Sequence, residues 1–261
     1  MNKKILSIIF VLLMLLGSFS ACSKTPADID NKIDQAVSKV LLEDSKVYSK
    51  YGECYGEGHI VLGYDKVHTG YKVYTISTSA MYGFENNNFV AIVSNEPMPM
   101  IVELNDDLLY RKLISVKNDK NYTENIQQLF PKEYHQRLSI VSAEDKENLF
   151  SQRDKYAYDY LTEIGRTAYV GNIEYFKDSY KSYDDYLIDS KISKSLMKID
   201  RLKDYPFWNG SREIVDNGTR YVYSTKIDLI NERIVYSKTN YDTNEILELY
   251  YYSIKTGEEL K

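Results

Sequence analysis

The side chains that perform most enzyme chemistry form no recognisable catalytic group in this sequence. The three histidines, His59, His68 and His135, lack the spacing of metal ligands, and two cysteines add little to a ligand set. His59 and His68 could face each other across a hairpin, although a structural role for each is the simpler interpretation. Signatures of zinc peptidases, serine hydrolases, nucleotide-binding loops and calcium loops are absent. We therefore expect no catalytic residue, no metal site and no cofactor.

Two short motifs of penicillin-recognising enzymes do occur, as Ser195-Leu196-Met197-Lys198 (S-x-x-K) and Lys255-Thr256-Gly257 (K-T-G). The first pattern arises readily by chance in a chain rich in Ser and Lys, and the S-x-N element that belongs between the two is missing. The K-T-G lies too close to the S-x-x-K for that fold and is better interpreted as a final turn. Carboxylates are abundant, yet the sequence singles out no pair of them. A hydrolase or transferase of the cell envelope, using carboxylates or Ser195, remains the alternative to a non-enzymatic protein.

Tyrosine dominates the aromatic residues, with 26 Tyr beside eight Phe and one Trp. Half-exposed positions of antiparallel sheets favour Tyr, and this structural interpretation is stronger than one in which Tyr forms a sugar- or peptide-binding surface. The densest aromatic cluster is Tyr205-Pro206-Phe207-Trp208-Asn209-Gly210. It is more typical of a corner of the core than of a binding platform.

The first residues have the pattern of a bacterial lipoprotein signal peptide over residues 1–21. Lys3 and Lys4 precede an apolar run from Ile5 to Leu16, which is too short to span a bilayer comfortably. Phe19-Ser20-Ala21-Cys22 resembles a lipobox, in which the Cys thiol receives diacylglycerol and the new N-terminus a fatty acid such as palmitate. We expect Cys22 to be lipidated. An ordinary secreted protein cut near Ala21 is the alternative.

Composition and charge indicate the class of protein and its location in the cell. With 43% hydrophobic and 27% charged residues the chain can build a core, and its net charge of -5 argues against a nucleic-acid-binding protein. Abundant Lys, Asn, Ile and Tyr are typical of a low-GC Gram-positive bacterium, so we expect the protein on the extracytoplasmic face of the cell membrane. After lipidation of Cys22 only Cys54 remains, which excludes an internal disulfide. A buried bystander thiol is favoured over a reactive one.

Hydrophobic spacing predicts an α+β fold with antiparallel β meanders at both ends of the chain, a helical middle and an N-terminal amphipathic helix. Thr25, Pro26 and Asp28 are typical of a helix start. No linker or repeat forces a boundary, so residues 22–261 are expected to form one extracytoplasmic domain. Its expected parts are a helix over 26–42, a β-rich region over 55–116, a helical region over 122–204 and a β meander over 211–255.

Capping and turn residues define several of these elements more closely. Ser142 and the acidic residues after it begin a helix that we expect over 143–164. Asn217-Gly218 predicts a type I′ hairpin turn, Thr123 is expected to cap a short helix, and a weaker helix is expected around Asp184 to Leu202. Short runs rich in Val, Ile and Tyr predict the strands His59–Asp65, Tyr71–Ser79, Phe89–Ser94, Met100–Leu104, Leu108–Ser115, Arg220–Leu229, Arg233–Thr239 and Glu245–Ile254.

Five short segments resemble, in this order, the C-terminal extracytoplasmic region of clostridial membrane metallopeptidases of the beta-lactam-sensor (BlaR-like) type. The resemblance runs from about residue 45 to about residue 255. The chain lacks the transmembrane helices and the zinc motif of those peptidases, and Ser94 to Pro99 replaces a Gly-rich stretch of theirs. The segments are Tyr71-Lys72-Val73-Tyr74, Tyr82-Gly83-Phe84-Glu85-Asn86, Leu129-Phe130-Pro131-Lys132-Glu133-Tyr134-His135, Ile164-Gly165-Arg166 and Trp208-Asn209-Gly210-Ser211-Arg212-Glu213.

The resemblance implies a stand-alone, lipid-anchored copy of a domain whose role is sensing or interaction, without peptidase activity. The expected function is therefore a non-enzymatic sensing, binding or protein-interaction module at the membrane. Its partners would be the membrane, through the lipid anchor, and either a membrane protein or a ligand of the cell envelope. The residues suggested as ligand contacts are Tyr82, Phe84, Glu85, Asn86, Trp208 and Arg212.

Overall fold

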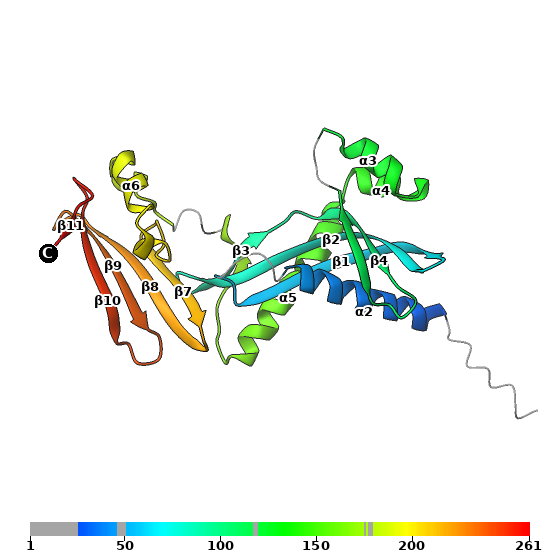
Figure 1. The fold of residues 1–261 in the computed structure, drawn as a ribbon, viewed down its shortest axis with the longest axis horizontal. Helices are drawn as coiled ribbons and strands as arrows, with labels where there is room; N and C mark the ends of the chain where they lie inside the picture. Colours follow the sequence, from blue (N-terminus) through cyan, green and yellow to red (C-terminus); the bar gives the residue numbers. More distant parts are fainter. Residues whose placement is uncertain (1–25, 46–50, 117–119, 175, 177–179) are drawn as a thin grey trace, which may run out of the picture.

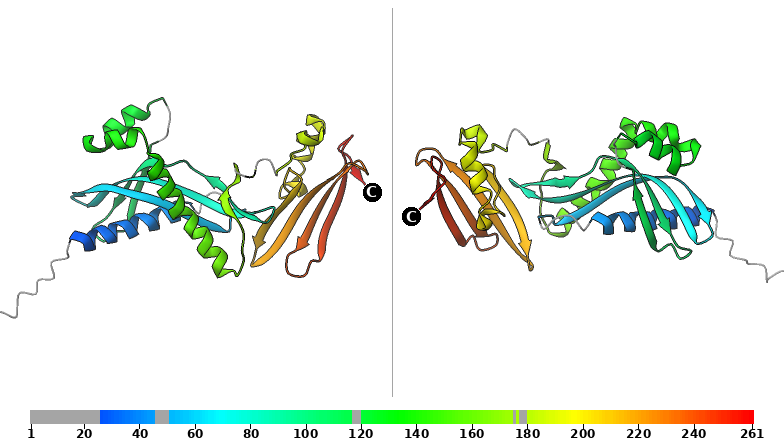
Figure 2. Two further views of the ribbon diagram at one scale, coloured as in Figure 1. Left: turned by 180° about the vertical axis from the view of Figure 1, so that it is seen from behind. Right: turned by 45° about the horizontal axis from the view of Figure 1, so that its top comes forward.

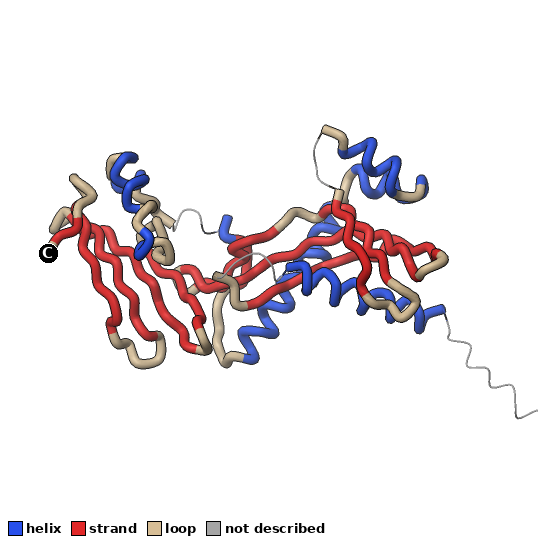
Figure 3. Tube along the Cα trace, in the orientation of Figure 1, coloured by secondary structure: helices blue, strands red, loops and turns tan. Residues whose placement is uncertain are grey.

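One mostly antiparallel sheet runs through most of the protein, as Figures 1 and 3 show. The computed structural model describes residues 26–45, 51–116, 120–174, 176 and 180–261. Within these residues the sheet has eleven strands, and helices precede β1, lie between β5 and β6, and lie between β6 and β7. The predicted α+β class, with strands at both ends and a helical middle, is confirmed.

The N-terminal half of the sheet is organised around its longest strand, β2. Along one edge β2 pairs with β1, and along the other it pairs first with β4 and then with β3. β5 extends the sheet beyond β4, and β6 pairs with β3 in parallel. The strands are β1 (Cys54–Val67), β2 (Gly70–Glu85), β3 (Asn88–Ser94), β4 (Met98–Leu104), β5 (Tyr110–Ser115) and β6 (Val170–Asn172).

Two long helices pack on opposite faces of β1, because successive strand residues point to opposite sides. Helix α2 (Pro26–Ser45) confirms the predicted N-terminal helix, and its apolar stripe, which includes Ile33 and Val37, packs with strand residues of β2 and β4. Helix α5 (Ala143–Glu163) lies on the other face and confirms the predicted helix over 143–164. As predicted, Ser142 caps it by accepting a hydrogen bond from the Asp145 backbone N–H.

The short helices between β5 and α5 close a third part of the core. They are α3 (Tyr122–Leu129), η1 (Lys132–Tyr134) and α4 (His135–Ser139), and their apolar residues pack with Tyr74 and Ile76 of β2. The prediction that Thr123 caps α3 is wrong, because the N-cap position belongs to Asn121. The capping prediction for Thr25 lies outside the described residues.

The C-terminal part is a second meander, covered on one face by short helical turns (Figure 1). Its strands are β7 (Gly210–Asp216), β8 (Thr219–Asp228), β9 (Arg233–Asn240), β10 (Ile246–Ser253) and β11 (Glu259–Leu260). Asn217 and Gly218 both have positive φ, which confirms the predicted hairpin turn. The helix expected around Asp184 to Leu202 is instead three turns, η3 (Asp184–Tyr186), α6 (Ser190–Leu196) and η4 (Asp200–Leu202).

Tyrosine rings fill the core between these turns and the meander. Tyr183, Tyr205, Tyr223, Tyr236 and Tyr252 are all buried there, and the rings of Tyr205 and Tyr236 meet edge to face. These Tyr residues are structural, but they are buried and not half-exposed as predicted, and Tyr183 and Tyr205 lie outside the strands. The two halves of the sheet join where β2 ends, and β2 and β7 pair there at Glu85 and Arg212.

Candidate functional site

A polar crevice of about 470 Å³ lies between α2 and α5, along the edge of β1 that has no neighbouring strand within the described residues. Helix α2 supplies one wall, helix α5 the other, and β1 forms the floor. The side chains that line this crevice are those of Asp34, Gln35, Ser38, Glu57, His59, Gln152, Lys155, Tyr156 and Asp159.

The floor of the crevice is a chain of hydrogen bonds centred on two buried residues, Glu57 and His59. The His59 side chain is 6% exposed and that of Glu57 is 3% exposed. His59 Nδ1 lies 2.9 Å from Glu57 Oε2, and His59 Nε2 lies 3.1 Å from Asp34 Oδ1. Ser38 Oγ donates to Glu57 Oε1 at 2.7 Å, and the Tyr156 hydroxyl lies 3.1 Å from the same oxygen. A carboxylate with these partners is held in one orientation.

Electrostatics favour the charged forms of both floor residues. Burial by itself would raise the pKa of Glu57, but the hydrogen bonds and charge of His59, with those of Ser38 and Tyr156, bring that pKa below its ordinary value. Burial would likewise lower the pKa of His59, and Glu57 and Asp34 together raise it instead. The imidazole is therefore held between two carboxylates as a cation over a wider pH range than a free histidine.

Local sequence explains why these side chains meet. Glu57 and His59 are two apart on a strand and so face the same helix, α2. Asp34 and Ser38 are four apart on that helix and so lie on one side of it. The Gln152 side chain of α5 accepts a hydrogen bond from the backbone N–H of His59 at 3.0 Å, which satisfies the unpaired edge of β1.

Two glycines allow α5 to approach β1 closely enough to form the second wall. A Cβ on Gly58 would lie 2.1 Å from the backbone O of Leu149, and one on Gly56 would lie 2.3 Å from the backbone O of Arg153. Real side chains do not tolerate such distances, so the alternation of glycine with Glu57 and His59 sets the spacing between strand and helix.

The bonding pattern suits ligand binding better than nucleophilic catalysis. Ser38 Oγ donates to the Glu57 carboxylate, whose lowered pKa makes it a weak base, and not to His59. Both nitrogens of His59 are occupied by carboxylates. Of these two partners, Asp34 is 62% exposed, so water can solvate it once a ligand displaces it from His59, and its displacement costs less free energy than that of Glu57. The walls add amide, ammonium and carboxylate groups that can bind hydroxyl or amine groups of a ligand.

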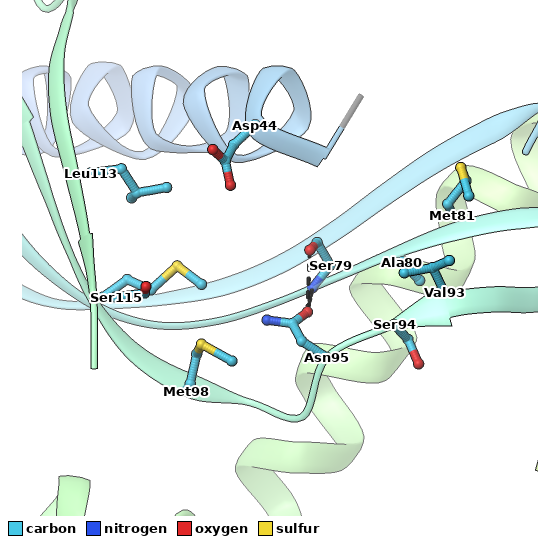
Figure 4. Close-up of a pocket in the computed structure, with 11 residues that line it drawn as sticks. Asp44, Ser79, Ala80, Met81, Val93, Ser94, Asn95, Met98, Leu113 and Ser115 are labelled. Carbon is cyan, nitrogen blue, oxygen red and sulfur yellow. Dashed lines mark hydrogen bonds between the residues drawn. The ribbon is translucent and has the colours of Figure 1, made fainter. Parts of the chain in front are cut away.

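A second, more apolar groove of about 270 Å³ lies where β2 exchanges β4 for β3 (Figure 4). Met81, Met98, Met100 and Leu113 are among its lining residues. At the fork, Asn95 Oδ1 accepts hydrogen bonds from the backbone N–H and hydroxyl of Ser79 at 2.6 and 3.1 Å. The groove offers adaptable methionine side chains and one carboxylate, Asp44, whereas the crevice gathers several charged and hydrogen-bonding side chains, so the crevice is the stronger candidate.

Five of the six residues suggested as ligand contacts meet at the junction of β2 and β7. Arg212 Nε donates to Glu85 Oε1 at 2.6 Å, and the Arg212 guanidinium lies 4.9 Å from the centre of the Trp208 ring. The Asn86 backbone N–H donates to the Ser211 carbonyl at 2.9 Å. The fifth residue, Phe84, is buried beneath Arg166, whose guanidinium lies 3.5 Å from its ring centre. Contact of these residues with a ligand stays a prediction.

The sixth residue, Tyr82, lies apart from this junction, beneath α5. Its side chain is fully buried, its hydroxyl donates to Asp154, and it accepts a hydrogen bond from Arg153 Nε at 2.9 Å. Tyr82 therefore helps to hold α5 against β2, and its hydroxyl is already engaged by two partners.

Charged side chains tie the two halves of the sheet together at the same junction. Arg166 binds both carboxylate oxygens of Glu213 at 2.5 and 3.0 Å, and Arg220 binds both oxygens of Glu53 at 2.6 and 2.7 Å. Arg220 also lies 2.8 Å from Glu213, which joins the two pairs into a network. Three of the five segments quoted for the resemblance contribute to this junction or to its immediate surroundings, namely Tyr82–Asn86, Ile164–Arg166 and Trp208–Glu213.

The remaining chemically interesting residues are placed as follows. Ser195 Oγ donates to the Ile192 carbonyl at 2.8 Å, an ordinary local bond of a helical serine, and Gly257 adopts the positive φ of a turn. Cys54 is a buried free thiol, as expected, and burial raises its pKa to about 12. The idea that His59 and His68 face each other is wrong, because His59 pairs across the hairpin with Ser77. Cys22 lies outside the described residues.

Sequence reasoning missed the crevice, although one signal pointed to it. The alternation Gly56-Glu57-Gly58-His59 places two ionisable side chains on one face of a strand and two glycines on the other. A strand face made of glycines allows the backbone of another element to pack closely against it. Asp34 and Gln152 could not be added from sequence, because they come from separate helices.

No family model, curated protein or solved structure matches this chain. Among the residues that the structure describes, no three His, Cys, Asp or Glu side chains are grouped so that they could hold a metal ion. Of the helices in that part of the chain, none combines the length and apolar character needed to cross a membrane.

Proposed function

We propose that the protein is a lipid-anchored extracytoplasmic binding module that recognises a polar ligand of the cell envelope in the crevice between α2 and α5. The observation that carries this proposal is the buried pair of Glu57 and His59, which opens through the exposed Asp34 to a concave polar surface. Titratable groups with shifted pKa values in a concavity make it a candidate functional site.

Charge indicates the class of ligand. With His59 protonated, the crevice holds two cations, His59 and Lys155, against three carboxylates, Asp34, Glu57 and Asp159. This balance disfavours anions and suits a neutral or cationic compound rich in hydroxyl or amine groups, such as a glycan or an amino sugar. The expected lipidation of Cys22 supports the setting, since an anchor keeps the module near envelope ligands at high effective concentration.

The resemblance to the extracytoplasmic region of beta-lactam-sensor peptidases supports sensing over catalysis, and the protein would then be a stand-alone copy of such a domain. A hydrolase or transferase of the cell envelope is the second candidate, and the acid–base pair of Glu57 and His59 is the observation in its favour. Against it stands the bonding of His59, since both of its ring nitrogens are bound by carboxylates and neither accepts a proton from a hydroxyl among the described contacts of the crevice.

Thermal unfolding of the soluble form that lacks residues 1–22 tests the proposal, with a panel of muropeptides, oligosaccharides, beta-lactams, short peptides and divalent metals. A ligand at a hundred times its Kd stabilises the protein by about 2.7 kcal/mol. For a chain of this size the Tm then rises by roughly 5–10 °C.

Two matched variants locate the site. Gln35 lines the crevice and Gln128 lies on α3 outside it, and both are exposed helix residues. Gln35→Arg should abolish the ligand-induced rise in Tm, because a longer cationic side chain fills the crevice, whereas Gln128→Arg should keep it. A rise in Tm that survives Gln35→Arg unchanged contradicts binding in the crevice. Product formation from any compound of the panel favours the enzyme instead.

A further inference from the structure

Two hairpin turns at one end of the protein form a single exposed surface, which we call the hairpin tips (residues 66–69 and 105–112). Lys66 Nζ lies 2.5 Å from Asp106 Oδ1, and Arg111 donates to the Thr69 carbonyl at 3.2 Å, so each turn supports the other. The two turns are therefore held together by these contacts and form one surface.

Apolar and aromatic side chains on these tips are left exposed by the residues that the structure describes. Val67 is 40% exposed, Leu109 58% and Tyr110 56%. Lys66, Arg111 and Lys112 surround them, against two carboxylates, Asp106 and Asp107, so the tips carry a formal charge of +1 while the whole chain carries -5. Exposed apolar and tyrosine side chains rimmed by Lys and Arg are typical of surfaces that meet a lipid interface.

The described chain begins at the same end of the protein. Helix α2 starts beside the tips, and the Tyr64 hydroxyl of β1 donates to Asp30 of its first turns at 2.8 Å. Figures 1 and 2 show the start of α2 and both hairpin turns at one end of the molecule, and the C-terminal meander at the other. Only residues 23–25 lie between Cys22 and Pro26, and the four steps from Cys22 to Pro26 span at most about 14 Å.

We infer that the hairpin tips rest on the lipid bilayer, so that the C-terminal meander points away from the membrane. The inference depends on the proposed lipidation of Cys22 and adds to it a specific contact surface. A short tether brings the tips to the bilayer, their apolar side chains enter the interface, and their cations meet anionic headgroups. The remainder of the chain carries the excess of negative charge and is repelled by the same headgroups.

Fluorescence quenching in vesicles tests this orientation. The acylated full chain, carrying either Leu109→Cys or Ile230→Cys, is labelled with an environment-sensitive maleimide dye. It is then placed in phosphatidylglycerol and phosphatidylethanolamine vesicles that contain spin-labelled lipid. Ile230 is the matched control, since it is 94% exposed in the turn between β8 and β9 at the distal end. Acylation blocks Cys22, and Cys54 is buried, so the unsubstituted chain gives the labelling blank.

The expected result is a loss of fluorescence from the dye at position 109 and none from the dye at position 230. A second variant, Leu109→Glu, should reduce the quenching of a dye placed at Val67→Cys. The orientation is overturned if acylated protein floats with the vesicles but the dye at position 109 is not quenched, or is quenched no more than the dye at position 230. A chain that is not acylated and does not float overturns both the lipid anchor and the orientation.

Discussion

The protonation of Glu85 should make the stability of the protein fall as the pH rises through neutrality. This residue ends β2 at the junction with the C-terminal meander, and it is 1% exposed. Arg212 donates to its Oε1, while its Oε2 has no hydrogen-bond partner among the described residues. Burial raises the pKa of Glu85 to about 7, and the charge and hydrogen bond of Arg212 offset only part of that effect.

The size of the effect follows from the two pKa values. The ordinary pKa of the carboxyl is 4.5 and the folded value is about 7, a difference that corresponds to about 3 kcal/mol. The folded state binds the proton more tightly, so the gain in stability is complete below pH 4.5 and is lost as the pH rises through the folded pKa. Glu85→Gln removes the titration, so the wild type should lose about 3 kcal/mol relative to this variant between about pH 4.5 and about pH 8.

Urea unfolding of both proteins at several pH values measures this difference. Glu259→Gln is the matched control, because Glu259 also pairs with an arginine, Arg201, but both side chains are more than 40% exposed. The control should follow the wild type closely, since exposed pairs contribute little. Parallel pH profiles for the wild type and Glu85→Gln would refute the claim that Glu85 takes up a proton near neutral pH.

Three further predictions concern the crevice and the anchor. Gly58→Ala should lower the free energy of unfolding by about 1–3 kcal/mol or more, measured in urea, because its Cβ meets the backbone of Leu149; an unchanged midpoint would show that α5 can move away. The free energy of unfolding of the wild type should exceed that of Glu57→Gln by the largest margin between pH 4.5 and 6.5. The lowered pKa of Glu57 stabilises the folded state above pH 4.5, and the raised pKa of His59 stabilises it below pH 6.5. An advantage that grows toward pH 9 would contradict this pairing. Cys22→Ser should move the protein from the membrane fraction to the medium, and unchanged membrane retention would exclude the lipid anchor.

Elements whose conformation depends on residues adjacent in the chain could be predicted from the sequence. The turn at Asn217-Gly218 requires two positive φ angles, which few other pairs allow, and the start of α5 is encoded by Ser142 and the backbone it caps. The polar segment around α6 was less predictable, because its turns are held by Tyr residues of the meander rather than by a helical stripe of their own.

The candidate site depends on packing between distant segments and was therefore beyond sequence reasoning. Asp34, Glu57 and Gln152 come from a helix, a strand and a second helix, and nothing in their local sequence marks them as neighbours. The residues suggested from the sequence, such as Glu85 and Arg212, do lie together, yet they face each other across the junction of the sheet. Their contact with a ligand stays a prediction.

Nuclear magnetic resonance of the histidine imidazole nitrogens tests binding in the crevice most directly, because the chain has only three histidines. The soluble form is titrated with the compound of the panel that raises its Tm. Binding in the crevice predicts a large shift of the His59 resonances, through displacement of Asp34, and none for His68 or His135. A ligand that raises the Tm while leaving the His59 resonances in place would contradict it.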